Sequence, residues 1–489
     1  MSSTPPSRLL LADDYFGLCY LSLATQAYAP CPVLIPTSVA AMPIPPEVAG
    51  HWECVWGPAT DISGSVAGAN LMYIVVLNDT TPGAEGPAFA VVVLRGTDLN
   101  LDRLADLEQI ADDMEVWQQV PWAYPFTSGS PPGNVALGTN TALGLLVQST
   151  PPDGMPGAGM NLLQFLQKLE ENNPGLPVVV TGHSLGGCLT TVTAPYLAYE
   201  FKQAGVVVDI LANPFAPPTA GDRDFAVQYL ASLSKNPAYL SGSAVWYNTH
   251  DPAPYVWNRD RTSPLNVHAL KGLWSSNPQA KQIPDALVLT LADLPGNKQY
   301  AQPIFSPGRE NVVTIPVQTA DLADQFVAQH FPLDKKFPNA GYWKAIGSQP
   351  GPGAIDPPPY GATAITSLSL DGSGENTAIS VLGRGFPSSP TGLTDGLPGV
   401  VNEFSFVNLS RKGWSGGWTN PSQKDDPNKV TIKYSAWSSN AISTSGFGGA
   451  YGSKGRDHDW NVESGDRVQV HIYDHTGKTL LACAECKAP

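Results

Sequence analysis

Along the first 350 residues, short continuous apolar runs alternate with stretches in which apolar residues recur at helical spacing. Short apolar runs predict buried strands at 71–77, 89–94, 176–180, 206–211, 245–247 and 311–317. Between some of these runs, apolar residues recur at helical spacing, as in Leu162, Leu163, Phe165, Leu166 and Leu169. Because alternating strands and helices are typical of a mostly parallel sheet covered by helices, we predict an α/β domain over residues 1–350.

Beyond this region the periodicity changes. Residues 351–361, "GPGAIDPPPYG", are rich in proline and glycine and predict a stiff linker. In residues 362–489, apolar and polar positions alternate with a period of two. This holds in "TAITSLSLDG", "TAISVLGRGF", "FSFVNLS", "VTIKYSAW" and "DRVQVHIYDHTGKTLLAC". The pattern predicts a second domain, an antiparallel β-sandwich.

The stretch "VVVTGHSLGGCLTT", residues 178–191, joins a predicted strand to a predicted helix. Ser184 lies in its Gly-x-Ser-x-Gly core, the sequence of a nucleophile elbow, in which a strained turn presents a reactive serine. Glycines are needed there because Cβ atoms would collide with neighbouring backbone. A second match, at Ser415 in "SRKGWSGGWTNPS", has neither a strand before it nor a helix after it, so we predict that Ser184 is the nucleophile. Pro195 is expected to kink or interrupt the helix that follows.

Composition and charge limit the classes of molecule that the protein is expected to bind. The chain has 27 Lys and Arg against 42 Asp and Glu, a net charge of −15. This balance disfavours nucleic acid and anionic membranes, since both need clustered basic side chains. No run of 18 apolar residues occurs, so no transmembrane segment is expected. The 47 glycines and 47 prolines predict long ordered loops.

The N-terminal stretch "MSSTPPSRLLLADDYFGLCYLSLATQAYA" has the apolar character of a signal peptide. Asp13 and Asp14 interrupt its apolar run, however, and the apolar residues after them recur with a helical period. We therefore expect a helix that opens the first domain. We also expect a soluble protein, either intracellular or exported by a non-classical route.

The six cysteines are consistent with several roles. Cys31 and Cys54 could close a disulfide in an oxidising compartment, whereas Cys19 and Cys188 look like small core residues. The C-x-x-C at 483–486 is solitary, and zinc would need a second pair of ligands at usable spacing. We expect neither a metal nor an organic cofactor.

Four stretches occur along the first domain in this order: "VVVLRGTDL" (91–99), "TGHSLGG" (181–187), "FAPPTAGDRDFA" (215–226) and "VWYNTHDPAPYV" (245–256). Together they resemble the class 3 lipases, which are α/β-hydrolases, over about residues 15–345. The resemblance implies that Asp251 is the acid of a catalytic triad. It also implies that Thr97 and the Leu185 amide form the oxyanion hole. The alternatives are that Asp251 initiates a turn before its proline and that Thr97 only ends a strand.

The general base of such a triad is a histidine that follows the acid in the chain. His268 follows Asp251 too closely for the strand and loop that the fold places between acid and base. His330 has room and follows the predicted strand 311–317. We therefore favour His330 and keep His268 as the alternative, and for either one a core or surface role is the competing interpretation.

Residues 99–117 carry an apolar stripe opposed by charged residues. The stripe consists of Leu99, Leu101, Leu104, Leu107, Ile110, Met114 and Trp117. In the family the matching segment is a lid that opens at a lipid–water interface, although a plain surface helix has the same pattern. The chain departs from the fungal members at residues 135–139, where they have V-H-x-G-F. The long stretch between Asp251 and His330 is a candidate second cap.

These residues predict a serine hydrolase of lipase type that cleaves carboxylic esters through an acyl-enzyme, with an ester or lipid as substrate. The alternative is a binding protein on a hydrolase scaffold, whose β domain recognises a carbohydrate or a surface. Its aromatic platform would consist of Trp414, Trp418, Trp437 and Trp460, which are equally suited to the core of such a domain.

Overall fold

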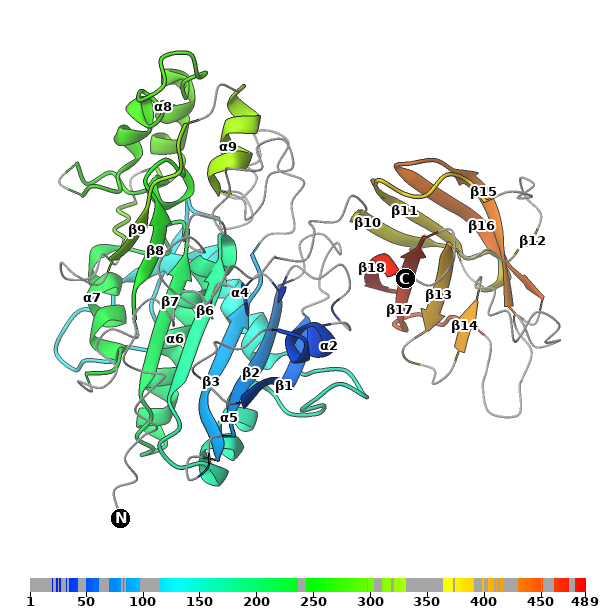
Figure 1. Cartoon of the computed structure of the whole chain (residues 1–489), viewed down its shortest axis with the longest axis horizontal. Coiled ribbons are helices and arrows are strands. Elements are labelled where there is room, and N and C mark those ends of the chain that lie inside the picture. Colours follow the sequence, from blue (N-terminus) through cyan, green and yellow to red (C-terminus); the bar gives the residue numbers. More distant parts are fainter. Residues whose placement is uncertain are drawn as a thin grey trace. The chain divides into compact units, whose positions relative to one another are not determined.

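A computed structural model gives the fold of the chain (Figure 1). It describes residues 20, 23–24, 26–27, 32, 35–42, 50–60, 70–80, 82, 85–96, 115–235, 243–261, 263–296, 298–302, 310–317, 321–330, 364–372, 374–390, 398–399, 403–408, 410, 414–416, 430–449, 451, 461–474 and 480–489. Two compact units are present, one formed mainly by residues 70–358 and the other mainly by residues 359–489.

The larger unit is built on a seven-stranded sheet with the order β1-β2-β3-β6-β7-β8-β9. The strands are β1 (Gly50–Thr60), β2 (Leu71–Asp79), β3 (Gly86–Leu94), β6 (Val178–His183), β7 (Ile210–Phe215), β8 (Val245–Asn248) and β9 (Glu310–Val313). β3 and the four strands after it run parallel, while β1 and β2 extend one edge in antiparallel pairs. The prediction of a mostly parallel sheet is confirmed. A small two-stranded sheet pairs β4 (Gln119–Pro121) with β5 (Asn134–Ala136).

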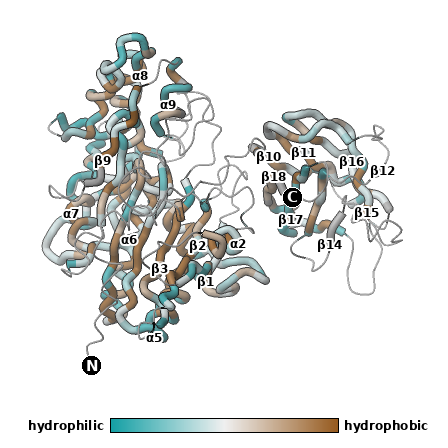
Figure 2. Tube along the Cα trace, viewed as in Figure 1, coloured by the Kyte–Doolittle hydropathy of each residue, from teal (hydrophilic) through white to brown (hydrophobic). Residues whose placement is uncertain are grey.

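Helices cover this sheet. They are α2 (Ile35–Ala40), α4 (Leu137–Gln148), α5 (Leu162–Asn172), α6 (Leu185–Gln203), α7 (Arg223–Ser232), α8 (Asp285–Asp293) and α9 (Leu322–His330), with 3-10 turns η4 (Ala253–Tyr255) and η5 (Val267–Gly272). The central helix α6 packs against β3, β6 and β7, and Figure 2 shows hydrophobic residues concentrated along the strands. The expectation that Pro195 interrupts this helix is wrong, because α6 continues through it. Residues 186–198 are all buried, so tertiary packing outweighs the local cost of the proline.

One strand boundary differs from the prediction. β7 begins at Ile210 rather than at Val206, because the end of α6 extends further than the apolar pattern indicates. Gly205 has a φ of 71°, and the amides of Gly205 and Val206 donate to the carbonyls of Lys202 and Phe201 at 3.1 and 2.9 Å. These bonds form a Schellman motif, which satisfies the last carbonyls of the helix before the chain enters the strand.

The smaller unit is antiparallel except for one parallel pair, β14 with β15, which confirms its predicted class. Its strands are β10 (Ala364–Asp371), β11 (Ala378–Arg384), β12 (Pro398–Gly399), β13 (Phe404–Asn408), β14 (Trp414–Gly416), β15 (Val430–Trp437), β16 (Ala441–Gly449), β17 (Arg467–Tyr473) and β18 (Leu480–Lys487), and η6 (Gly374–Asn376) lies between the first two. Along β17, alternate side chains of Val468, Val470 and Ile472 enter one apolar core. The end strands β10 and β18 of this single sheet contact each other, so the sheet folds over its own core.

The cysteines correct one expectation. Cys54 is a free, buried thiol, so it forms no disulfide with Cys31. Cys188 is a free core residue, as predicted, and burial raises the pKa of both free thiols to about 12, which leaves them protonated and unreactive. In the C-x-x-C, Cys483 is disulfide-bonded whereas Cys486 is a buried thiol, so this motif is not closed by an internal disulfide.

Several predictions lie outside the described residues. They concern Thr97, Cys19 and Cys31, the lid segment as far as Met114, the linker 351–361, and two of the tryptophans, Trp418 and Trp460. Trp437 is described, and it is partly buried and packs against the core of the β unit. Its ring contacts Phe404 and Tyr434, and its indole N–H donates to the carbonyl of Pro387 at 2.8 Å. The one tryptophan of the predicted platform whose contacts are described therefore serves the interior of the β unit.

Candidate active site

The three residues of the predicted triad lie at one edge of the parallel sheet. Ser184 directly follows β6, Asp251 follows β8 after two residues, and His330 is the last residue of α9, which comes after β9. Because the carboxyl ends of parallel strands lie along the same edge of a sheet, side chains far apart in the sequence meet there.

The turn at Ser184 has the strained geometry of a nucleophile elbow. Its φ of 58° and ψ of −124° lie in a region that residues with a side chain rarely adopt. The backbone N–H of Ser184 donates to the carbonyl of Phe215 at 2.9 Å, which fixes the turn to the neighbouring strand β7. Ser184 is the N-cap of α6, yet its hydroxyl makes no capping bond, so the hydroxyl is available for another partner.

Glycine is required at Gly186 for a steric reason. A Cβ atom at this position would lie 2.8 Å from the Arg95 carbonyl carbon and from the Gly96 nitrogen, which are rigid backbone atoms of the segment that follows β3. We expect Gly186→Ala to lower the free energy of unfolding by about 3 kcal/mol or more, because the backbone has to shift. Urea unfolding of the full chain measures this effect.

The matched control is Gly144→Ala in α4. A Cβ atom at Gly144 has no atom within 4 Å, so alanine fits without strain. We expect this variant to be unchanged or more stable by up to about 1 kcal/mol, given the higher helix propensity of alanine. Equal stability of the Gly186 and Gly144 variants would contradict the close approach of the elbow to the end of β3.

His330 lies between the serine and the acid. Its Nε2 is 2.9 Å from the Ser184 hydroxyl, and its Nδ1 is 2.9 Å from each Asp251 carboxylate oxygen. The three side chains are almost wholly buried, with relative exposures of 4% for Ser184, 0% for Asp251 and 1% for His330. With the proton on Nδ1 donated to Asp251, Nε2 accepts a hydrogen bond from the serine hydroxyl.

His268, the alternative base, lies elsewhere. It sits half-buried in η5, and its backbone N–H donates to the side chain of Asn266 at 3.1 Å. Partial desolvation and the nearby Arg261 and Arg259 lower the pKa of His268. The structure therefore brings His330, and not His268, to Ser184 and Asp251.

Asp251 also initiates a turn, which was the alternative to its catalytic role. Its carboxylate accepts a hydrogen bond from the backbone N–H of Ala253 at 2.9 Å, so it does initiate the turn that leads into η4. This bond fixes the carboxylate while it faces His330. The two roles are therefore compatible, because one oxygen accepts from the turn and both remain within reach of the imidazole.

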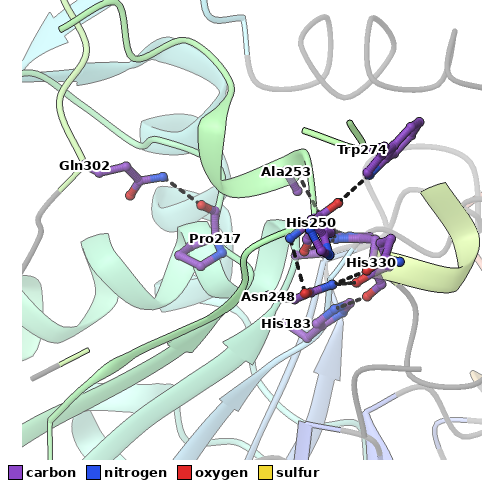
Figure 3. Close-up of polar contacts among 11 residues, drawn as sticks. His183, Pro217, Asn248, His250, Ala253, Trp274, Gln302 and His330 are labelled. Atoms are coloured by element: carbon purple, nitrogen blue, oxygen red, sulfur yellow. Dashed lines mark hydrogen bonds and ion pairs between the residues drawn. The ribbon is translucent and has the colours of Figure 1, made fainter. Parts of the chain in front are cut away.

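Residues outside the predicted triad, for which the sequence indicated no such contacts, hold the loop of Asp251 (Figure 3). The Trp274 indole N–H donates to the carbonyl of His250 at 2.8 Å, and the His250 Nδ1 donates to the carbonyl of Ile315 at 2.7 Å. The side-chain amide of Gln302 donates to the carbonyls of Pro217 and Pro254 at 2.9 and 2.8 Å. The stretch between Asp251 and His330 thus braces the acid, in addition to any role as a cap.

Of the two predicted oxyanion donors, one can be placed. Leu185 is the first residue of α6, where backbone N–H groups have no partner within the helix and the helix dipole favours negative charge. The residues before Thr97, Arg95 and Gly96, approach the elbow at Gly186. The end of β3 and the start of α6 are therefore neighbours at the serine.

A second serine–histidine pair, in the β unit, differs from the Ser184–His330 pair in its hydrogen-bond partners and in the basicity of its histidine. The Ser405 hydroxyl lies 3.3 Å from Nδ1 of His471, but Nε2 of His471 donates to the amide oxygen of Gln469 at 2.7 Å, so among the described residues an amide, and not a carboxylate, orients the ring. Burial lowers the pKa of His471 to about 4, which makes it a weak base at neutral pH. Ser415, the second Gly-x-Ser-x-Gly match, lies within the strand β14, opposite Val407.

In the part of the chain that the structure describes, no group of three or more His, Cys, Asp or Glu side chains is arranged to hold a metal ion. Among the described helices, none combines the length and the apolar character that crossing a membrane requires.

The fold and the site together have the form of an α/β-hydrolase with a Ser-His-Asp arrangement. Residues 91–260 match the family model for lipase (class 3), which confirms the predicted resemblance for this part of the chain. No curated protein gives a significant match.

Solved structures of lipases are similar to the chain. The crystal structure of M37 lipase matches with a TM-score of 0.53 and 23% identity, over 65% of this chain and 90% of that chain. At this identity the match shows the fold, that of an α/β-hydrolase. A triacylglycerol lipase from Penicillium expansum (15% identity, 52% of this chain and 75% of that chain) and a lipase from Rhizopus microsporus var. chinensis (15%, 52% and 74%) have TM-scores of 0.31 and 0.32, too low to support a conclusion.

Proposed function

We propose that this protein is a serine hydrolase that cleaves carboxylic esters of lipids through an acyl-enzyme. The observation that carries the proposal is the buried chain of hydrogen-bond distances from Ser184 through His330 to Asp251, each 2.9 Å, beside a strained strand–helix turn. The class 3 lipase match over residues 91–260 supports an ester as the substrate.

The proposed reaction begins when the Ser184 oxygen attacks the ester carbonyl carbon and His330 Nε2 takes the hydroxyl proton. The carbonyl π electrons move to the oxygen, and the tetrahedral intermediate collapses as His330 returns the proton to the leaving alcohol. Asp251 holds the imidazole in the tautomer with Nδ1–H and stabilises its charged form. Water, activated by the same histidine, then releases the carboxylic acid and restores Ser184.

The oxyanion would be stabilised by the Leu185 N–H and by Thr97, the residue after Gly96. Removing one donor of such a hole typically lowers kcat by about 10²- to 10³-fold. Ser184 is only 4% exposed, and residues 99–117 are the proposed lid over it. Trp117, at the end of this segment, is 41% exposed, which suits contact with an apolar substrate or surface.

The test combines an activity profile with covalent labelling of the full chain. Hydrolysis of p-nitrophenyl esters from acetate to palmitate is measured first, and a rate that rises with acyl length is expected for a lipid hydrolase. A fluorophosphonate should then block this activity in a one-to-one reaction, and mass spectrometry should find the adduct on Ser184. No hydrolysis of any ester, or labelling on Ser415 instead, would count against the proposed function.

A further inference from the structure

The helix that ends with the proposed base is held by two side chains from other elements. The Nε2 of His183 donates to the backbone carbonyl of His330 at 3.1 Å, and the side-chain amide of Asn248 donates to the backbone carbonyl of Gln329 at 2.9 Å (Figure 3). The Asn248 amide also lies 2.7 Å from the side-chain oxygen of Gln329. Two consecutive carbonyls are therefore bound from two different strands.

These carbonyls are the ones that α9 cannot satisfy itself. The last four carbonyls of any helix have no N–H partner within the helix, so their partners decide where the helix end lies. His330 is the final residue of α9, so its own carbonyl and the preceding one fix the position of its Cα. A shift of this backbone would move the imidazole away from both of its partners.

The two donors are neighbours of the other members of the triad. His183 precedes Ser184 at the end of β6, and Asn248 ends β8, three residues before Asp251. Asn248 is itself fixed, because its side-chain oxygen accepts from the backbone N–H groups of His250 and Ile315 at 3.2 and 3.1 Å. Ser184 and Asp251, the two side-chain partners of His330, are thus each close in the chain to a residue whose side chain binds a backbone carbonyl at the end of α9.

We infer that His183 and Asn248 are positioning residues that set the distances from His330 to Ser184 and Asp251. The inference rests on the proposed function. Neither side chain would touch the ester; each would act by fixing the backbone of the base. Such positioning matters because a misplacement of about 1 Å can lower a reaction rate by about 10²-fold.

The protonation state of His183 fits this role. Its ring is fully buried and lies 4.9 Å from the His330 ring, centroid to centroid. Desolvation, and then the charge of His330, lower its pKa well below the usual value, so His183 remains neutral with its proton on Nε2. A neutral ring donates to the carbonyl without opposing the positive charge that His330 gains during the reaction. Asp251 and His183 are the titratable side chains that contact His330 among the described residues.

The test compares His183→Phe with His183→Gln in the full chain. Phenylalanine fills the same space without a donor, whereas the glutamine amide can donate near the position of Nε2. For a soluble ester we expect kcat of His183→Phe to fall by roughly 10- to 100-fold with KM unchanged, and His183→Gln to recover most of the loss. Asn248→Asp is the second variant, since it keeps the acceptor oxygen but removes the donor to Gln329, and a similar loss of kcat is expected.

A measurement that needs no substrate separates the positioning inference from the proposed function. Nitrogen-15 spectra of histidine-labelled protein report the Nδ1–H of His330 whether or not any ester is hydrolysed. If the wild type cleaves no ester but the His330 resonances change in His183→Phe, the proposed function fails and the positioning inference stands. If the wild type is active and His183→Phe and Asn248→Asp both keep kcat within twofold with unchanged resonances, the positioning inference is overturned and the proposed function stands.

Discussion

Ser184→Ala is expected to lower kcat for a soluble ester by about 10⁵- to 10⁶-fold, the scale at which loss of a serine nucleophile leaves only binding and oxyanion stabilisation. The oxygen that would form the acyl-enzyme is then absent, and His330 Nε2 loses the partner that lies 2.9 Å away. The measurement is kcat on a p-nitrophenyl ester of a length that the wild type hydrolyses, after circular dichroism has shown a native fold.

Two matched variants make the result specific. Ser415→Ala removes the serine of the second Gly-x-Ser-x-Gly match, and since Ser415 lies inside β14, its kcat should equal that of the wild type. Ser184→Gly removes the hydroxyl and also relieves the strain at φ 58°, so it should be as inactive as Ser184→Ala but more stable by about 1 kcal/mol. Substantial turnover by either Ser184 variant would remove this residue as the nucleophile.

The elbow was predictable from the sequence because its requirements are local. A buried strand, three glycines and a helix within some 30 residues suffice to define the turn, and periodicity reveals all of them. The choice between Ser184 and Ser415 depended on the same local context. The parallel sheet was predictable for a similar reason, since its strands are buried on both faces and appear as continuous apolar runs.

Other elements depend on contacts that periodicity does not contain. The alternating pattern does not indicate β16, because its sequence, "AISTSGFGG", is rich in serine and glycine and its pairing with β11 and β15 decides its conformation. The apolar run begins at Val206, before the start of β7 at Ile210, because a Schellman motif at Gly205 and Val206 ends α6 there. The sequence predicts that Pro195 kinks or interrupts α6, yet the helix continues through it because the surrounding residues are buried on the sheet.

The same limit applies within the site. The acid and the base were predictable as residue types in the right order along the chain, and His330 was favoured on its separation from Asp251. The contacts that support the acid and the base were not predictable, because each contact joins residues that are distant in the sequence. The bond from His183 to His330 spans 147 residues, and the bond from Asn248 to Gln329 spans 81. Only the folded chain brings these groups together, so no local pattern indicates them.

Asp251→Asn is expected to lower kcat by about 10⁴-fold while leaving the fold intact. The asparagine side-chain oxygen can still accept from Ala253 N–H, so the turn into η4 is preserved. Its amide then faces Nδ1 of His330 as a donor, which places the imidazole proton on Nε2. In that tautomer the ring cannot accept the Ser184 proton. The measurements are kcat on a soluble ester and nitrogen-15 spectra of the imidazole, which should show the tautomer change.

Asp222→Asn is the matched control for this result, since it makes the same chemical change at a partly buried carboxylate that, like Asp251, accepts a hydrogen bond from a backbone N–H. Asp222 caps α7 through the Phe225 N–H at 2.9 Å and also accepts from the Asn134 amide at 2.7 Å. Asparagine caps helices about as well as aspartate, so kcat should stay close to that of the wild type. If Asp251→Asn keeps kcat within tenfold of the wild type, then Asp251 does not set the tautomer of His330, and its carboxylate serves mainly the turn before η4. If both variants lose activity equally, the loss reflects general damage to the α/β unit, and the role assigned to Asp251 has no support from this substitution.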